Sequence, residues 1–267
     1  MEEGRSGTRI LETILAQKRV DLERAKRERP LDLLQQEVED LRKCRSLLAC
    51  IAAKEGPPHR IIAEIKRASP SRGVLRSDLD PQELAAKYER AGASGISVLT
   101  DERFFGGSLS HLSDVRAHVE LPLLRKDFLI DPYQVFESRV RGADAVLFIV
   151  RALEDGQLGK LLEETAGLGM EALVEIHDER DLERTLDTNC LMIGINNRDL
   201  RTFRVDLAVT ERLVARMPGH VVVISCSGID RREQILRLEA MGVRGFLIGE
   251  SLVTSTDPES RLRELVS

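Results

Sequence analysis

The sequence has no tryptophan, two tyrosines and seven phenylalanines, so aromatic side chains make up only 3% of its 267 residues. A buried core therefore has to be built mainly from leucine, isoleucine, valine and alanine. Hydrophobic residues account for 42% of the chain and charged residues for 32%. This composition allows a sizeable core beneath a well-solvated surface.

Cysteine is also scarce and shows no metal-binding pattern. None of the four cysteines belongs to a CxxC pair, and no histidines cluster at metal-ligand spacing. We therefore expect no bound metal, and reduced thiols as in a cytosolic protein. The four cysteines are Cys44, Cys50, Cys190 and Cys226.

Two further absences limit the expected partners. The net charge is -5, whereas nucleic-acid binding needs a basic surface. No apolar run approaches the roughly 18 residues that span a membrane. The first ten residues, MEEGRSGTRI, are polar and acidic, unlike a secretory signal. The sequence thus predicts a cytoplasmic protein that binds neither nucleic acid nor a membrane.

The N-terminal part of the chain has a helical pattern. Over residues 8–29, apolar side chains fall near one helical face, and residues 31–41 could form a second short helix after Pro30. Tandem prolines exclude helix from residues 54–60. We predict a helical extension over about residues 1–58, packed on the rest of a single domain that covers residues 1–267. The apolar positions are Ile10, Ile14, Leu15, Leu22 and Ala25.

After this extension, short β-rich apolar runs alternate with helical stretches. Most runs are continuously apolar, as in parallel strands that are buried on both faces. Acidic N-caps are expected to begin several helices, two of them followed by proline, and glycines to end them. The eight runs are 61–66, 96–100, 121–128, 145–150, 172–177, 192–196, 221–225 and 245–249. The expected N-caps are Asp80, Asp131, Asp178 and Asp230, and the expected terminating glycines are Gly92, Gly142, Gly169 and Gly242.

Eight βα units leave two architectures, a closed (β/α)8 TIM barrel and a doubly wound open sheet. The barrel is favoured because eight strands close it and because a barrel typically has about 250 residues. A dinucleotide-binding open sheet would need a GxGxxG motif after its first strand, and the sequence has none there.

Charged residues gather where the barrel strands should end, and the C-terminal ends of the strands hold the active site in this fold. Glu64 and Lys66 share a parity and can both point into the barrel, while Lys126 and Glu175 lie in apolar runs. An ionised side chain in such a run is costly unless it is paired or functional. We interpret the four as acid–base groups; the alternative is a structural ion-pair network that closes the top of the barrel.

Two glycine turns follow the last two strands, at Ser227-Gly228-Ile229 and at Gly249-Glu250-Ser251. Paired turns at these positions form the phosphate site of many such barrels. The alternative is that the glycines only make tight turns. Together with the charged residues, they predict an enzyme that acts on a small phosphorylated metabolite.

Several strings resemble the indole-3-glycerol-phosphate synthase family. They occur in the family's order from about Ile10 to the C-terminus, and EIKRASPS and GINNRDL together are highly specific. The others are LLRKDF on the third strand, LVEIH on the fifth, FFGGS after the second and FLIG on the last.

The resemblance implies the TIM-barrel fold and a carboxy-lyase reaction without metal or cofactor. It implies Lys126 as general acid and Glu175 as general base, with Lys66 as a further acid, and with Glu64 and Asn196 orienting the lysines and binding substrate hydroxyls. Substrate-binding residues would be Ser69, Phe105, Phe128, Arg198 and Ser227. Phosphate would be bound by Lys66, Gly228, Gly249 and Glu250. It also implies contacts with other tryptophan-pathway enzymes and a monomer or weak dimer.

One position departs from the family pattern. The family usually has Glu-Ser-Gly-Ile after the seventh strand, whereas this chain has Cys226-Ser227-Gly228-Ile229. Cys226 would act as a small apolar filler or, since nearby lysines would lower its pKa, as a reactive thiolate. Two rival functions remain: a sugar-phosphate isomerase of the same fold, and a non-catalytic barrel that binds phosphorylated ligands.

Overall fold

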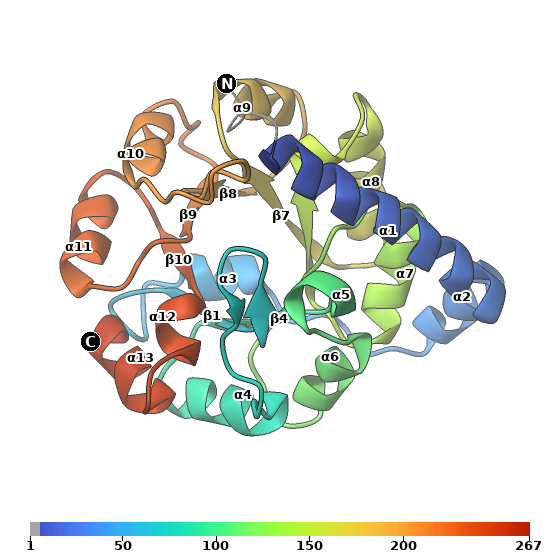
Figure 1. Cartoon of the computed structure of the whole chain (residues 1–267), viewed down its shortest axis with the longest axis horizontal. Coiled ribbons are helices and arrows are strands. Elements are labelled where there is room, and N and C mark those ends of the chain that lie inside the picture. The colour runs from blue at the N-terminus through green and yellow to red at the C-terminus, as the bar shows by residue number, and fades with distance from the viewer. Residues whose placement is uncertain (1–5) are drawn as a thin grey trace.

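Eight parallel strands form a closed barrel in the computed structural model, which describes residues 6–267 (Figure 1). Their order around the barrel is β1-β10-β9-β8-β7-β6-β5-β4, so the prediction of a TIM barrel is confirmed. The strands are β1 (Ile61–Ile65), β4 (Gly95–Leu99), β5 (Leu123–Lys126), β6 (Ala145–Ile149), β7 (Glu171–Ile176), β8 (Met192–Asn196), β9 (Val222–Cys226) and β10 (Gly245–Ile248).

Helices surround the barrel, and most of the expected caps are found. Asp80, Asp131 and Asp178 are N-caps whose side chains accept backbone N–H groups. The four terminating glycines all have positive φ, from 68° at Gly169 to 106° at Gly242. The surrounding helices are α4 (Pro81–Arg90), α6 (Leu109–Arg116), α7 (Pro132–Val140), α8 (Gln157–Gly167), α9 (Glu179–Leu186), α10 (Ala208–Val214), α11 (Arg232–Ala240) and α13 (Pro258–Val266).

The prediction that Asp230 caps a helix is wrong. The N-cap of α11 is Arg231. The side-chain oxygen of Gln234 accepts the backbone N–H groups of both Asp230 and Arg231, at 2.9 and 3.0 Å. Because Gln234 satisfies these two donors from inside the helix, the helix starts one residue later than an aspartate cap would place it.

Side chains alternate between the barrel interior and the helix layer, as strand geometry requires. On β1, Ile62 belongs to the interior cluster, whereas Ile61 and Ala63 pack with residues of the surrounding helices. The interior cluster also includes Leu124 and Leu173. Glu64 and Lys66 have the parity of Ile62, and both side chains line a cavity at the end of the barrel.

The N-terminal segment covers both ends of the barrel. Helix α1 (Ser6–Glu28) crosses the C-terminal ends of the strands in Figure 1, and α2 (Leu31–Glu39) packs against α7. Helix α3 (Leu47–Ala52), which the sequence patterns did not predict, lies at the opposite end, since Ser46 and Leu48 donate hydrogen bonds to Glu171, the first residue of β7.

Smaller elements surround the C-terminal ends of the strands. The hairpin of β2 (Ala68–Ser69) and β3 (Gly73–Val74) follows β1 and was not predicted from the sequence. Short helices follow β4, β6 and β10: α5 (Glu102–Phe105), η2 (Val150–Ala152) and α12 (Glu250–Val253). Within residues 6–267, no helix is both long and apolar enough to cross a membrane. The single-domain prediction also includes residues 1–5, which lie outside this range.

Candidate active site

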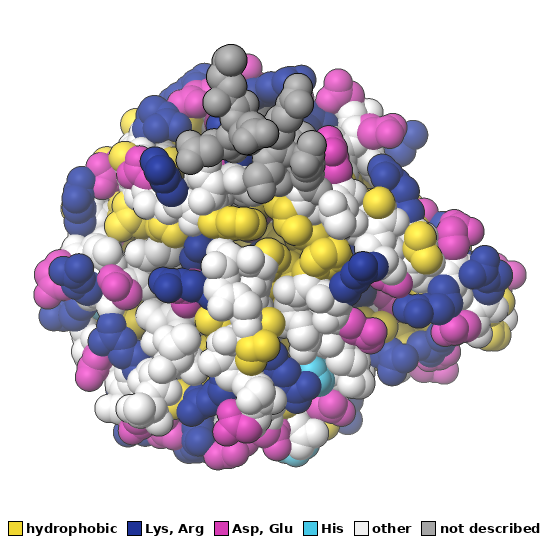
Figure 2. Space-filling model, in the orientation of Figure 1, with side chains coloured by type: hydrophobic (Ala, Val, Ile, Leu, Met, Phe, Trp, Pro, Cys, Tyr) yellow, Lys and Arg dark blue, Asp and Glu magenta, His cyan; other side chains and the backbone are white. Residues whose placement is uncertain are grey.

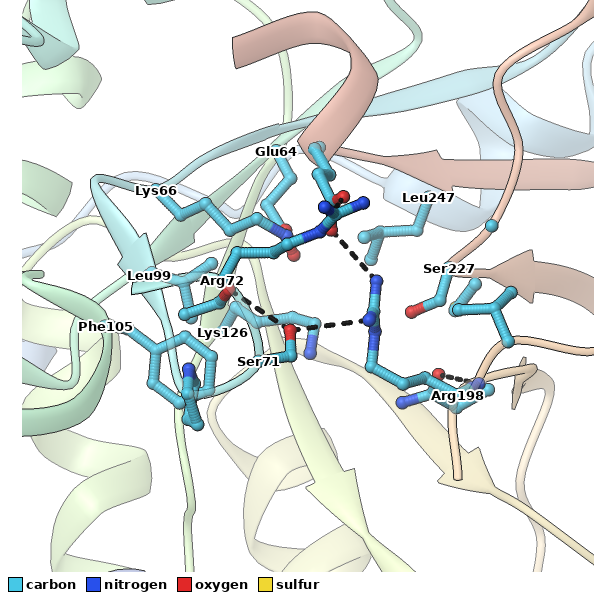
Figure 3. A pocket seen from close by; sticks show the side chains of 18 of the residues that line it. Glu64, Lys66, Ser71, Arg72, Leu99, Phe105, Lys126, Arg198, Ser227 and Leu247 are labelled. Atoms are coloured by element: carbon cyan, nitrogen blue, oxygen red, sulfur yellow. Dashed lines mark hydrogen bonds and ion pairs between the residues drawn. The ribbon is translucent and has the colours of Figure 1, made fainter. Parts of the chain in front are cut away.

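A cavity of about 850 Å³ lies at the C-terminal ends of the strands. Figure 2 shows a band of hydrophobic side chains across this face, and Figure 3 shows the side chains that converge in the cavity. The lining includes every site residue that the sequence predicted: Glu64, Lys66, Ser69, Phe105, Lys126, Phe128, Glu175, Asn196, Arg198, Ser227, Gly228, Gly249 and Glu250. Among the described residues, no group of three or more His, Cys, Asp or Glu side chains could hold a metal ion.

Two lysine–glutamate pairs form the charged wall of the cavity. Lys66 Nζ lies 2.5 Å from Glu64 Oε1, and Lys126 Nζ lies 3.5 Å from Glu175 Oε2. Asn196 Nδ2 donates a 3.0 Å hydrogen bond to Glu175 Oε1. The side chain of Glu175 is 2% exposed and that of Lys126 is 17% exposed. The ion pairs therefore line an open cavity and do not fill the top of the barrel, which favours acid–base groups over a sealing network.

The two pairs keep each other ionised. Burial opposes the charge on Glu64, but Lys66 and Lys126 outweigh it and lower the pKa of this carboxyl. Burial also opposes the charge on Glu175, and Lys126 and His177 lower its pKa. Burial would lower the pKa of Lys126, but the carboxylates of Glu175 and Glu64 raise it. Near neutral pH, Lys126 therefore holds a proton to donate, and Glu175 is free to accept one.

One end of the cavity is apolar. The rings of Phe105 and Phe128 lie 6.1 Å apart at an interplanar angle of 40°. Ile10, Leu11 and Ile14 from α1 line the same cavity. Such a surface suits a flat aromatic group. The sequence patterns placed Ile10 and Ile14 on the packing face of a helix but did not predict that they reach the site.

Glycines shape the other end. Ser227 and Gly228 adopt consecutive left-handed conformations, with φ of 69° and 83°. A Cβ on Gly228 would come within 2.1 Å of Val205, and a Cβ on Gly249 would come within 2.3 Å of Glu64 Oε1. Gly249 therefore makes room for a charged side chain of the site. Gly249 thus has a role in the site besides making a tight turn.

An arginine cluster bridges two loops and a short helix beside these glycines. Glu250 accepts from Arg72 Nε and Arg198 Nη2, each at 3.0 Å. Arg198 Nη1 also donates to Ser71 Oγ at 3.4 Å (Figure 3). The cluster joins the loop after β1 to the loop after β8 and to α12. Arg72, which was not among the predicted site residues, comes from the unpredicted hairpin.

Cys226 is buried, with 2% of its surface exposed, and its Sγ lies within 4 Å of the backbone oxygen of Ile224. Burial and the nearby charge of Glu175 raise the pKa of its thiol well above the ordinary value, despite Lys126. The interpretation of Cys226 as a thiolate activated by lysines is therefore wrong. The thiol stays protonated, as expected of a small filler.

A buried ion-pair cluster behind the cavity wall was not predicted from the sequence. Lys18 Nζ from α1 lies 3.1 Å from Asp101 and 2.8 Å from Asp127, and all three side chains are buried. Asp127 directly follows Lys126 in the chain and also accepts from Thr100 Oγ1 at 2.6 Å. A lysine in the middle of an amphipathic helix usually faces solvent, so local sequence gave no signal for this contact.

The comparisons with known proteins agree with this geometry. The family model for indole-3-glycerol phosphate synthase matches residues 11–265. An indole-3-glycerol phosphate synthase of Dehalococcoides mccartyi (strain CBDB1) is 48% identical over 260 residues, covering 96% of this chain and all of the relative. One of Desulfosudis oleivorans is 53% identical over 207 residues, covering 78% and 79%.

A solved structure supports the fold alone. KGPDC from Streptococcus mutans is similar with a TM-score of 0.59 and 14% identity, covering 79% of this chain and 96% of that one.

Proposed function

The chain belongs to the indole-3-glycerol phosphate synthase family, and we propose that its cavity residues divide the work of that enzyme between an acid–base centre, an aromatic pocket and a phosphate site. The reaction closes the ring of 1-(2-carboxyphenylamino)-1-deoxyribulose 5-phosphate to indole-3-glycerol phosphate, with loss of CO2 and water. The protein is thus a carboxy-lyase of tryptophan biosynthesis. The observation that carries the division of roles is the Lys126–Glu175 pair in the cavity wall.

Lys126 is the general acid of the ring closure. Attack by a carbon of the aniline ring requires a more electrophilic substrate carbonyl, and proton donation by a cationic acid provides this. The raised pKa of Lys126, which the carboxylates of Glu175 and Glu64 maintain against burial, keeps the ammonium protonated until the substrate oxygen takes the proton. Loss of the carboxyl group as CO2 then leaves an intermediate that still carries a hydroxyl.

Glu175 and Lys66 serve the dehydration. The hydroxyl leaves as water after it gains a proton from Lys66, and Glu175 removes the proton whose loss completes the indole ring. The low pKa of Glu175, held down by Lys126 and His177 against burial, keeps it ready as a base. Glu64 orients Lys66 through their 2.5 Å contact, and Asn196 orients Glu175 through its 3.0 Å hydrogen bond.

Binding energy comes from the two ends of the cavity. Phe105, Phe128 and Ser69 bind the anthranilate side of the substrate at the apolar end. The phosphate lies at the other end, near Lys66 and the backbone of Gly228 and Gly249. Glu250 contributes its backbone N–H, because its carboxylate is occupied by two arginines and would repel an anion. Arg198 and Ser227 contact the substrate between the two ends.

The location and the partners are part of the same proposal. We place the enzyme in the cytoplasm, as a monomer or weak dimer in contact with other enzymes of tryptophan biosynthesis. The acidic net charge of -5 supports the expectation that it does not bind nucleic acid.

The direct test mixes the purified protein with the carboxyphenylamino-deoxyribulose phosphate and follows indole fluorescence. We expect turnover by the wild type, and the loss of most of it in Lys126→Ala, with Lys87→Ala on the outer helix α4 as the matched control. Binding without turnover at high enzyme concentration would favour the rival, non-catalytic barrel, which the comparisons do not favour. Near-normal rates in Lys126→Ala would refute the acid assignment alone.

A further inference from the structure

A buried histidine behind the cavity lies between two carboxylates. His177 directly follows β7, and its side chain is 3% exposed. Its Nε2 lies 3.6 Å from Glu175 Oε1, and its Nδ1 lies 3.6 Å from Asp181 Oδ2. Neither ring nitrogen makes a hydrogen bond within the described part of the chain. A buried imidazole without hydrogen bonds is costly, so this arrangement calls for an explanation.

The outer carboxylate is firmly anchored. Asp181 belongs to α9 and accepts the backbone N–H of His177 at 2.9 Å and Arg151 Nε at 2.8 Å. Arg151 also pairs with Asp178, the N-cap of α9. Burial opposes the charge on Asp181, but the nearby His177 imidazole, the charge of Arg151 and the backbone N–H of His177 lower its pKa. Asp181 therefore presents a fixed negative charge to the imidazole.

The inner carboxylate is Glu175, whose two oxygens have different surroundings. Oε1 accepts from Asn196 at 3.0 Å and faces His177, whereas Oε2 faces Lys126 at 3.5 Å and has no hydrogen bond among residues 6–267. A donor on the Oε1 side fixes the rotation of the carboxyl group and leaves Oε2 as the basic oxygen.

We propose that His177 is a positioning residue for the catalytic base: its imidazole lies between Glu175, which faces Nε2, and Asp181, which faces Nδ1. By lowering the pKa of Glu175 it helps to keep this carboxyl ionised, and its place beside Oε1 leaves Oε2 to take the proton. The inference rests on the role of Glu175 proposed above, and it extends the site outward through Asp181 to Arg151 at the surface. His177 transfers no proton to the substrate itself.

The pH dependence has a definite sign. The charged groups around the imidazole are Glu175 on β7, Asp181 on α9 and Arg151 on η2, with Lys126 on β5 beyond Glu175. After Lys126, His177 is the next charge that lowers the pKa of Glu175, so removing its imidazole raises the pKa of the base. The acidic limb of the kcat profile, which reports the base in the enzyme–substrate complex, then moves to higher pH.

The test compares His177→Gln with His118→Gln, a change at an exposed histidine on the outer surface. For His177→Gln we expect kcat to fall about tenfold, KM to change little and the acidic limb to rise by about one pH unit. Asp181→Asn, which retains the size of the side chain, should shift the limb in the same direction by less. A purely structural role would lower stability without moving the limb.

Two results overturn the proposal: an unmoved acidic limb in His177→Gln, or, if that variant does not fold, an unmoved limb in Asp181→Asn. Glu175→Gln, measured alongside, distinguishes a failure of the base assignment from a failure of the role of His177. If Glu175→Gln stays active, the assignment of the base fails. If it is inactive while His177→Gln retains the wild-type kcat and pH profile, only the role of His177 fails.

Discussion

The two ends of the barrel are both covered by the N-terminal segment, but with opposite chemistry. At the N-terminal end of the strands, α3 inserts Leu47 and Ile51, which are 0% and 2% exposed. At the C-terminal end, α1 lies beside a cavity of about 850 Å³ lined by paired charges. One end is filled by apolar side chains, and the other is hollow and lined by charges. Stability and reactivity are thus built at opposite ends of the same strands.

Glycine serves both ends in the same way. A Cβ on Gly95 would come within 2.6 Å of Leu47, and a Cβ on Gly245 within 3.0 Å of Ile51. A Cβ on Gly249 would come within 2.3 Å of Glu64 Oε1. The missing side chain admits an apolar plug at one end and a carboxylate at the other. Substitutions at the filled end should therefore lower stability, and substitutions at the hollow end should lower kcat.

The largest expected effect on activity belongs to the hollow end. Glu175→Gln retains the shape of the side chain and its contact with Asn196 but removes the base. We expect kcat to fall by roughly 10² to 10⁴ with little change in the midpoint of thermal unfolding, since Lys126 keeps Glu64 as a nearby carboxylate. Fluorescence kinetics and calorimetry measure the two quantities. A large loss of stability without a loss of kcat would show that Glu175 serves the fold and not the reaction.

The largest expected effect on stability belongs to the filled end. Leu47→Ala removes a fully buried side chain and should lower the free energy of unfolding by roughly 2–5 kcal/mol. The kcat of the folded enzyme should stay unchanged. Leu33→Ala is the matched control, because that leucine is 47% exposed on α2. Urea titration measures the difference, and equal losses in the two variants would show that α3 does not close the barrel.

The contrast between the ends also explains what could be predicted from the sequence. Strands such as 192–196 and the turns at Gly92 and Gly142 depend on local patterns, and the structure confirms them. The cavity residues could be predicted because strand parity and strand ends place them together. Helix α3 could not, because six residues carry little periodicity and their burial depends on the distant Gly95 and Gly245.

Lys18 anchors helix α1 at the hollow, C-terminal end of the barrel and so tests whether that end also contributes to stability. Lys18→Met leaves Asp101 and Asp127 buried without this cation, and we expect a loss of about 1–3 kcal/mol, because Arg125 still pairs with Asp127. Lys26→Met is the control: Lys26 lies on the same helix at 2.8 Å from Asp131, but that pair is partly exposed. Equal losses in both variants would contradict the role of burial.

The loss in Lys18→Met should also depend on pH in a definite way. Burial opposes ionisation of Asp127, yet Lys18 and Arg125 hold the pKa of its carboxyl far below the ordinary value. A lowered pKa contributes stability that is present above the unfolded-state value of about 4 and is lost as the pH falls through the folded-state value. The difference between wild type and Lys18→Met should therefore be largest near neutral pH and shrink below about pH 4. A difference that grows with acidity would contradict the ion pair.

The smallest expected effect concerns Cys226, where a neutral thiol stands at a position that faces the charged wall. Cys226→Glu should raise kcat a few-fold, because a carboxylate beside Lys126 further favours its protonated form. Cys226→Gln adds nearly the same volume without the charge, so the difference between the two variants isolates the electrostatic contribution. If both variants lose activity equally, the site is limited by space and the thiol is the better filler. If only Cys226→Glu gains activity, the charged wall of this chain lacks one negative charge that would support the protonated lysines.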